Sequence, residues 1–126
     1  MPKDASDARA EIEARTAKAL ETGAPLSLGG DHSITYPILR AMQARYGKLN
    51  ILHVDAHTDL YDSFDGDRYS HASPFARAIE DACVGTLVQV GLRSVGPNER
   101  RFGESHGVVM LGADAAQANL HKRPHA

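Results

Sequence analysis

The sequence has little of what secreted, membrane-bound or nucleic-acid-binding proteins need. Its single cysteine, Cys83, excludes an internal disulfide and is interpreted as a buried small hydrophobe. No uninterrupted apolar stretch approaches the length of a membrane span, and the amino terminus is charged and alanine-rich, unlike a signal peptide. The 14 basic and 16 acidic residues give a formal charge of −2, without a long run of either sign. We therefore expect a cytoplasmic protein that binds a small molecule, with no nucleic-acid and no membrane partner.

The 126 residues leave room for one domain with a modest core, which would bury roughly two thirds of the unfolded surface. Apolar periodicity predicts helices at 5–22, 34–46, 73–83 and 97–105, and strands at 25–28, 49–54, 86–92 and 108–111. No pattern continues after Gly112. Strands that alternate with helices of about ten residues indicate an α/β fold with a parallel sheet and right-handed crossovers.

The most informative stretch is residues 51–62, where an apolar strand ends in acids and histidine. Asp55, His57 and Asp59 occupy every second position, which in an extended chain would place all three on one side. Such charges are expensive to desolvate unless something balances them, and two carboxylates beside an imidazole suit a divalent cation. A polar loop in water is the simpler alternative, but the complete triplet directly after a strand favours a metal site.

Two further histidines are predicted at the same edge of the sheet. His32 lies in the turn after the strand at 25–28, and His71 lies on the loop that follows Asp59. Ligands of open parallel sheets gather at the carboxyl ends of the strands, so these groups are expected to converge. We interpret His53 as a core or opposite-face residue out of phase with Asp55. The other histidines, His106, His121 and His125, are expected to face solvent. Arg93, after the strand at 86–92, is a candidate for the same rim, although a surface cation is the commoner interpretation.

Three motifs, in this order, carry a resemblance to a known family: Gly29-Gly30-Asp31-His32-Ser33, Asp55-Ala56-His57-Thr58-Asp59 and Ser70-His71-Ala72-Ser73-Pro74-Phe75. They resemble the ureohydrolases, which are arginases, agmatinases and their relatives and hydrolyse guanidino groups with a pair of manganese ions. The resemblance covers roughly residues 8–110 and is greatest to the agmatinase branch, through 59–62 and 66–71. It implies part of a three-layer α/β/α fold of the arginase/deacetylase type. We expect residues 1–111 to form a truncated ureohydrolase domain and 112–126 an unassigned tail.

The resemblance also implies roles for individual residues. His32, Asp55 and Asp59 would hold one manganese, His57 would hold the other with Asp55 bridging both, and His71 would assist proton transfer. A guanidinium resists attack by neutral water, whereas a metal pair lowers the pKa of a shared water and supplies hydroxide near neutral pH. A histidine can then pass a proton to the departing amine. Oxygen-rich ligation with some imidazole favours Mn²⁺, while zinc stays open.

The sequence departs from the family pattern in one important respect. The family supplies two more aspartates from an Asp-x-Asp motif on a later strand, and Asp114 has the wrong neighbours to match it. We therefore expect an incomplete site, encoded for agmatine hydrolysis to putrescine and urea. The alternative is a catalytically inactive remnant that binds metal or a full-length partner. A metallophosphoesterase is disfavoured, because its glycine-rich motifs follow its Asp-x-His.

The loop that runs into the third motif partly predicts the substrate. Arginases that hold an α-amino acid carry a stretch ending in Gly-Asn-x-His-Gly, and residues 69–72 depart from it. We therefore favour agmatine over arginine as the small guanidino substrate, and guanidino acids and formimino compounds stay open. Family resemblance also implies a homo-oligomer for the full-length form.

Overall fold

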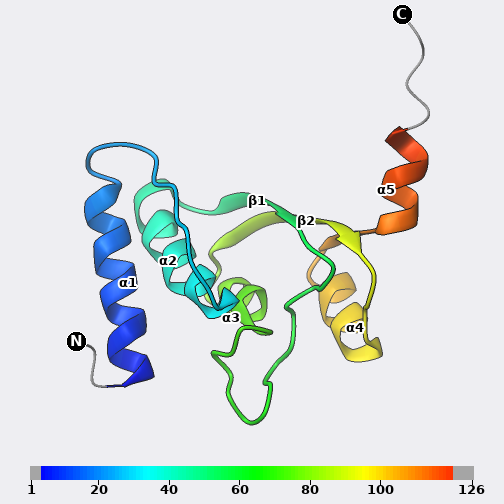
Figure 1. The fold of residues 1–126 in the computed structure, drawn as a ribbon, viewed down its shortest axis with the longest axis horizontal. Helices are drawn as coiled ribbons and strands as arrows, with labels where there is room; N and C mark the ends of the chain where they lie inside the picture. The colour runs from blue at the N-terminus through cyan, green and yellow to red at the C-terminus, as the bar shows by residue number, and fades with distance from the viewer. Residues whose placement is uncertain (1–3, 121–126) are drawn as a thin grey trace, which may run out of the picture.

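The structure, a computed structural model, describes residues 4–120 and is built on a three-stranded parallel sheet. Its strands are β1 (Leu49–Val54), β2 (Val84–Leu92) and β3 (Val109–Gly112), and they lie in the order β1-β2-β3. Helix α3 (Pro74–Glu80) connects β1 to β2, and helix α4 (Pro97–Ser105) connects β2 to β3 (Figure 1). The predicted α/β class with a parallel sheet is confirmed.

Three further helices complete the described chain. Helix α1 (Ala5–Ala19) begins where Asp4 accepts hydrogen bonds from two backbone amides of the first turn, and it lies beside α2 (Thr35–Tyr46). A short 3₁₀ helix, His32–Ile34, leads directly into α2. Helix α5 (Ala113–Leu120) follows β3, where the sequence pattern predicted no further element.

The predicted strand at 25–28 is wrong. Residues 24–29 form no regular element, and the side chains of Leu26 and Leu28 are almost fully exposed. A strand needs a neighbour that accepts and donates its backbone hydrogen bonds, and among the described residues β1 pairs with β2 alone. Local apolarity was therefore not enough to make this segment a strand.

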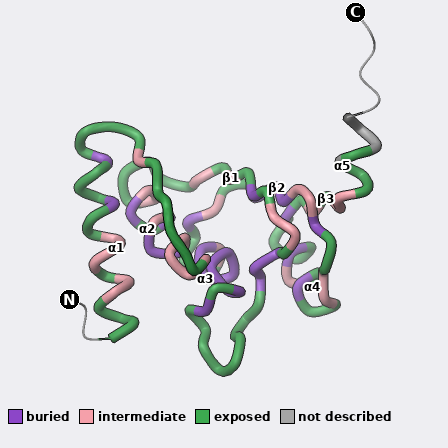
Figure 2. The backbone as a smooth tube through the Cα atoms, in the orientation of Figure 1, coloured by how far each residue is buried: buried purple, intermediate pink, exposed green. Residues whose placement is uncertain are grey.

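The core lies on one face of the sheet, under α2, α3 and α4. Helix α3 is buried along most of its length (Figure 2). The central cluster also contains Cys83, as predicted, and its members are Tyr36, Leu39, Leu60, Phe75, Ala78, Cys83, Leu87 and Val108. Leu52 and Val54, on the opposite face of β1, are 69% and 73% exposed. No helix within residues 4–120 is both long and apolar enough to cross a membrane.

Candidate metal centre

The site forms where the chain turns away from the sheet at the end of β1. Residues 55–57 bend immediately after Val54, and Asp59 adopts a left-handed backbone with φ 51°. The backbone N–H of His57 donates to Oδ1 of Asp55 at 2.8 Å, which closes the turn. The extended geometry expected beyond Val54 is therefore wrong: Asp55 and Asp59 return toward each other, while the side chain of His57 is 70% exposed.

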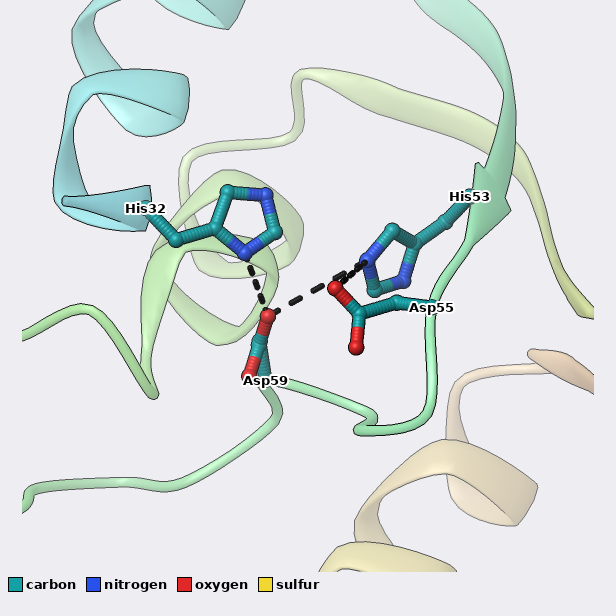
Figure 3. Close-up of side chains that lie close together, drawn as sticks. All are labelled: His32, His53, Asp55 and Asp59. Atoms are coloured by element: carbon teal, nitrogen blue, oxygen red, sulfur yellow. Dashed lines mark hydrogen bonds and ion pairs between the residues drawn. The ribbon is translucent and has the colours of Figure 1, made fainter. Parts of the chain in front are cut away.

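Four side chains converge in this turn (Figure 3). His32, His53, Asp55 and Asp59 each offer one nitrogen or oxygen, and these four atoms all lie within 4.8 Å of one another. Nδ1 of His32 is 2.5 Å from Oδ2 of Asp59, so the 3₁₀ helix before α2 is joined to the loop after β1. The ring of Phe75 packs against the imidazoles of His32 and His53 and gives the cluster an apolar neighbour.

The titration properties of these groups follow from their surroundings. The hydrogen bond to Asp59 raises the pKa of His32, against the opposing effect of its partial burial. Burial acts to raise the pKa of Asp55, but the amide hydrogen bond from His57 and the nearby imidazoles outweigh it, so this pKa lies below its ordinary value. Burial lowers the pKa of His53. These shifts favour the ionised form of Asp55, the neutral form of His53 and the charged form of His32.

The donor set fits a divalent cation. The cluster offers two carboxylates and two imidazoles with no thiolate, and these are ligands that Mn²⁺ and other divalent first-row metals accept. His53 is 7% exposed, and its Nε2 is buried without a hydrogen-bond partner. That nitrogen faces Oδ2 of Asp55 at 3.7 Å and Oδ2 of Asp59 at 4.0 Å. Two carboxylates that lie this close together repel each other, and a bound cation offsets that repulsion.

The structure brings together three of the four predicted metal ligands, namely His32, Asp55 and Asp59. His57 lies on the solvent side of the cluster, with Nδ1 3.2 Å from Oδ1 of Asp55. The exposed ring of His71 meets the ring of Phe64 at 5.1 Å between centroids. His57, Asp59 and His71 line one cavity of about 250 Å³, so the predicted proton-transfer residue and two of the predicted metal ligands border the same space.

His53 is the site residue that the sequence reasoning missed. Its predicted burial is confirmed, but its placement out of phase with Asp55 is wrong. His53 lies two positions before Asp55, and this spacing puts two strand residues on the same face. That spacing was the available signal. Arg93 and His106 are exposed as predicted, whereas His121 and His125 lie outside the described residues.

Comparisons with known proteins agree with this geometry. The family model described as Arginase family matches residues 1–123. The chain is 52% identical over 85 residues to "Arginase 1, mitochondrial" of Arabidopsis thaliana. The aligned region covers 67% of this chain and 25% of the relative. It is 43% identical over 88 residues to the N(1)-aminopropylagmatine ureohydrolase of Thermus thermophilus, covering 70% of this chain and 29% of that relative.

Comparison with solved structures agrees with the sequence comparisons. The solved arginase from Medicago truncatula superposes with a TM-score of 0.83 at 39% identity, covering 92% of this chain and 38% of that structure. The chain thus spans about a quarter of the length of the curated relatives that it matches. The family match over most of the chain, the shared fold and the converging ligands lead to one conclusion: this chain belongs to the arginase family.

Proposed function

We propose that this chain carries the manganese site of a ureohydrolase that cleaves a guanidino C–N bond, with agmatine as the substrate and urea and putrescine as products. The observation that supports this proposal is the convergence of His32, Asp55 and Asp59 at the carboxyl end of β1 in an arginase-family chain. Two carboxylates from the loop after β1 and one imidazole from the 3₁₀ helix before α2 form a preorganised set of ligands, because β1 and α2 hold these segments in place.

Each residue has a defined task in this proposal. His32, Asp55 and Asp59 hold the cation, and His57 stands beside Asp55 where a second cation would be shared. Bound manganese supplies the Lewis acidity that activates water near neutral pH. His71, across the cavity, moves a proton to the amine that leaves.

The cavity supports an amine substrate over an amino acid. The residues that line it include two acids, Asp59 and Glu99, and no lysine or arginine of the described chain. The α-carboxylate of arginine would therefore lack a cationic partner there, whereas the positively charged amine of agmatine would meet the aromatic faces of Tyr61 and Phe64. The remaining lining residues are His57, Tyr61, Phe64, His71, Ala72 and Ser94.

Arginine is the second candidate substrate. The observation that favours it is the 52% identity to a protein named arginase, which exceeds the 43% identity to the aminopropylagmatine ureohydrolase. Aminopropylagmatine would make a longer amine substrate of the same class as agmatine. The choice between an amine and an amino acid is open to a direct competition assay.

A urea-release assay tests the proposal. The described residues offer the second cation only His57 and a share of Asp55, so the chain alone should release no urea in excess Mn²⁺. The chain joined to the carboxyl-terminal part of a relative should release urea, faster from agmatine than from arginine. His57→Ala should abolish this release, and His106→Ala, an exposed histidine on another element, should not.

Three results would go against the proposal. Urea release by the isolated chain would mean that its ligand set is completed in another way, such as by a neighbouring copy. Preference for arginine would support the second candidate. A joined chain that folds and binds Mn²⁺ but releases no urea from either compound would identify a catalytically inactive remnant.

A further inference from the structure

Behind the candidate metal centre, three buried polar side chains are joined by hydrogen bonds to the loop that carries Asp59 or to the site itself. Gln89, Thr58 and Glu99 are all buried, and they come from β2, the loop after β1 and α4. Gln89 is the register partner of His53 across the two central strands. The NH₂ group of Gln89 is hydrogen-bonded while its Oε1 is buried without a partner, and the bonds of the NH₂ group link the cluster to the body of the fold.

The orientation of the Gln89 amide follows from one of these bonds. Its Nε2 lies 2.6 Å from the backbone carbonyl oxygen of Thr58. A carbonyl oxygen only accepts hydrogen bonds, so the atom facing it must be the NH₂ group and not the amide oxygen. Turning the amide over would place its oxygen against the carbonyl oxygen of Thr58, where neither atom can donate.

The same NH₂ group determines the hydrogen position on His53. Nε2 of Gln89 is 3.1 Å from Nδ1 of His53. An amide NH₂ only donates, so Nδ1 must accept and carries no hydrogen. The hydrogen of the His53 ring is then on Nε2, the nitrogen that faces Asp55 and Asp59.

We propose that Gln89 is a positioning residue that holds His53 as the Nε2–H tautomer, so that His53 supports the carboxylates of Asp55 and Asp59 instead of ligating the cation. This inference rests on the proposed cation site. An N–H directed at two carboxylates favours their ionised form and orients them, whereas it offers no lone pair to a metal. The ligands of the cation from this chain are then His32, Asp55 and Asp59, although His53 is equally close.

The arrangement also explains why the buried carboxylate of Asp59 is tolerated beside that of Asp55, whose side chain is 34% exposed. Asp59 receives a hydrogen bond from His32 on one side and faces the N–H of His53 on the other. Thr58, the neighbour of Asp59, donates its hydroxyl to Glu99 at the start of α4, and Glu99 also accepts from the backbone N–H of Gly96. The loop that carries Asp59 is thereby fixed to β2 and to α4.

Nuclear magnetic resonance of the chain with isotopically labelled histidines tests the tautomer. At a pH well above the ordinary histidine pKa, the two-bond nitrogen–proton couplings distinguish the two neutral forms. We expect His53 to show the Nε2–H form alone in the wild-type chain. Gln89→Met replaces the NH₂ donor with an apolar side chain of similar size. In this variant, a second population of His53 with hydrogen on Nδ1 should appear. Gln43→Met, on α2, is the matched control and should leave His53 unchanged.

A second measurement separates this inference from the cation site itself. Cd²⁺ enriched in its spin-active isotope should show a nitrogen–cadmium coupling at His32 and none at His53. Hydrogen on Nδ1 of His53 in the wild-type chain, or a cadmium coupling at its Nε2, would overturn the role proposed for Gln89. Failure of Cd²⁺ and Mn²⁺ to bind at all would refute the cation site, and the tautomer measurement would still decide the assignment on the metal-free chain.

Discussion

Replacement of Asp59 by asparagine should remove most of the stabilisation that Mn²⁺ gives to the fold. Asp59 is 7% exposed, joins His32 at 2.5 Å and has φ 51°. Asparagine keeps the shape of the side chain and tolerates the left-handed backbone, so the loop is retained. What is lost is one of two carboxylates and its negative charge at the cation.

The size of the expected change in Tm follows from the coupling between cation binding and folding. At a free Mn²⁺ concentration of about 100 times the Kd, binding stabilises the folded state by about 2.7 kcal/mol. For a chain of 126 residues, an unfolding entropy of about 2.1 cal/mol/K per residue turns this into a Tm increase of about 10 °C. Loss of a ligand should weaken binding at least as much as loss of an outer partner, by about 100-fold, which leaves an increase of about 1–2 °C.

The assay monitors thermal unfolding by far-ultraviolet circular dichroism, in chelator and in Mn²⁺, for the wild type, for Asp59→Asn and for a control variant. Asp65→Asn is the matched control, because Asp65 also has a positive φ, 50°, but lies outside the cluster. It should keep the full Mn²⁺ effect. An unchanged Mn²⁺ effect in Asp59→Asn, or an equal loss in both variants, would refute the reasoning.

Three other predictions concern the support of the site, the core and the open sheet face. Gly91→Ala should destabilise the chain by about 1–3 kcal/mol in urea unfolding, because φ at this position is 93° and the added methyl would lie 3.4 Å from the backbone oxygen of Asp55. Burial and the hydrogen bond to Asp81 raise the pKa of Tyr36 to about 12, so this phenol should ionise last in an alkaline absorbance titration. The protonated phenol of Tyr36 adds to the free energy of unfolding at pH values below its ordinary pKa of 10.0, and this contribution is lost as the pH rises to about 12. Sedimentation should show heterogeneous association, and lysine at both Leu52 and Val54 should reduce it, since these exposed side chains extend an uncovered sheet face.

Two of these three predictions have a control variant. Gly23→Ala should be close to neutral, because a Cβ there meets nothing within 4 Å. Tyr36→Phe should remove the late step of the absorbance titration, and Tyr46→Phe should leave it. A single monomeric species of the wild-type chain would contradict the inference drawn from the exposed sheet face.

The sequence predicted the elements whose signals are local. The helix at 97–105 was found with its bounds, because proline at its first position and the following charged residues are a local start signal. The strand at 49–54 was likewise found from its apolar run before the acids. Segment 25–28 has the same apolar character but forms no strand, since strand formation depends on a neighbour that the local sequence does not specify.

The candidate site was predictable in composition and only partly in geometry. His32, Asp55 and Asp59 were identified from their motifs, and the structure brings them together. The alternation rule failed after Val54, because the backbone bends there and a positive φ at Asp59 reverses its direction. Gln89 could not be recognised as part of the site, since a single glutamine in an apolar strand gives no indication of what it will face.

The most direct test of the central claim is to locate manganese in a crystal of the chain grown with Mn²⁺, by anomalous scattering at the manganese edge. The account predicts a peak coordinated by carboxylate oxygens of Asp55 and Asp59 and by a ring nitrogen of His32 at the end of β1. A fully ordered turn at residues 55–59 with no anomalous peak, or a peak confined to another part of the chain, would contradict it.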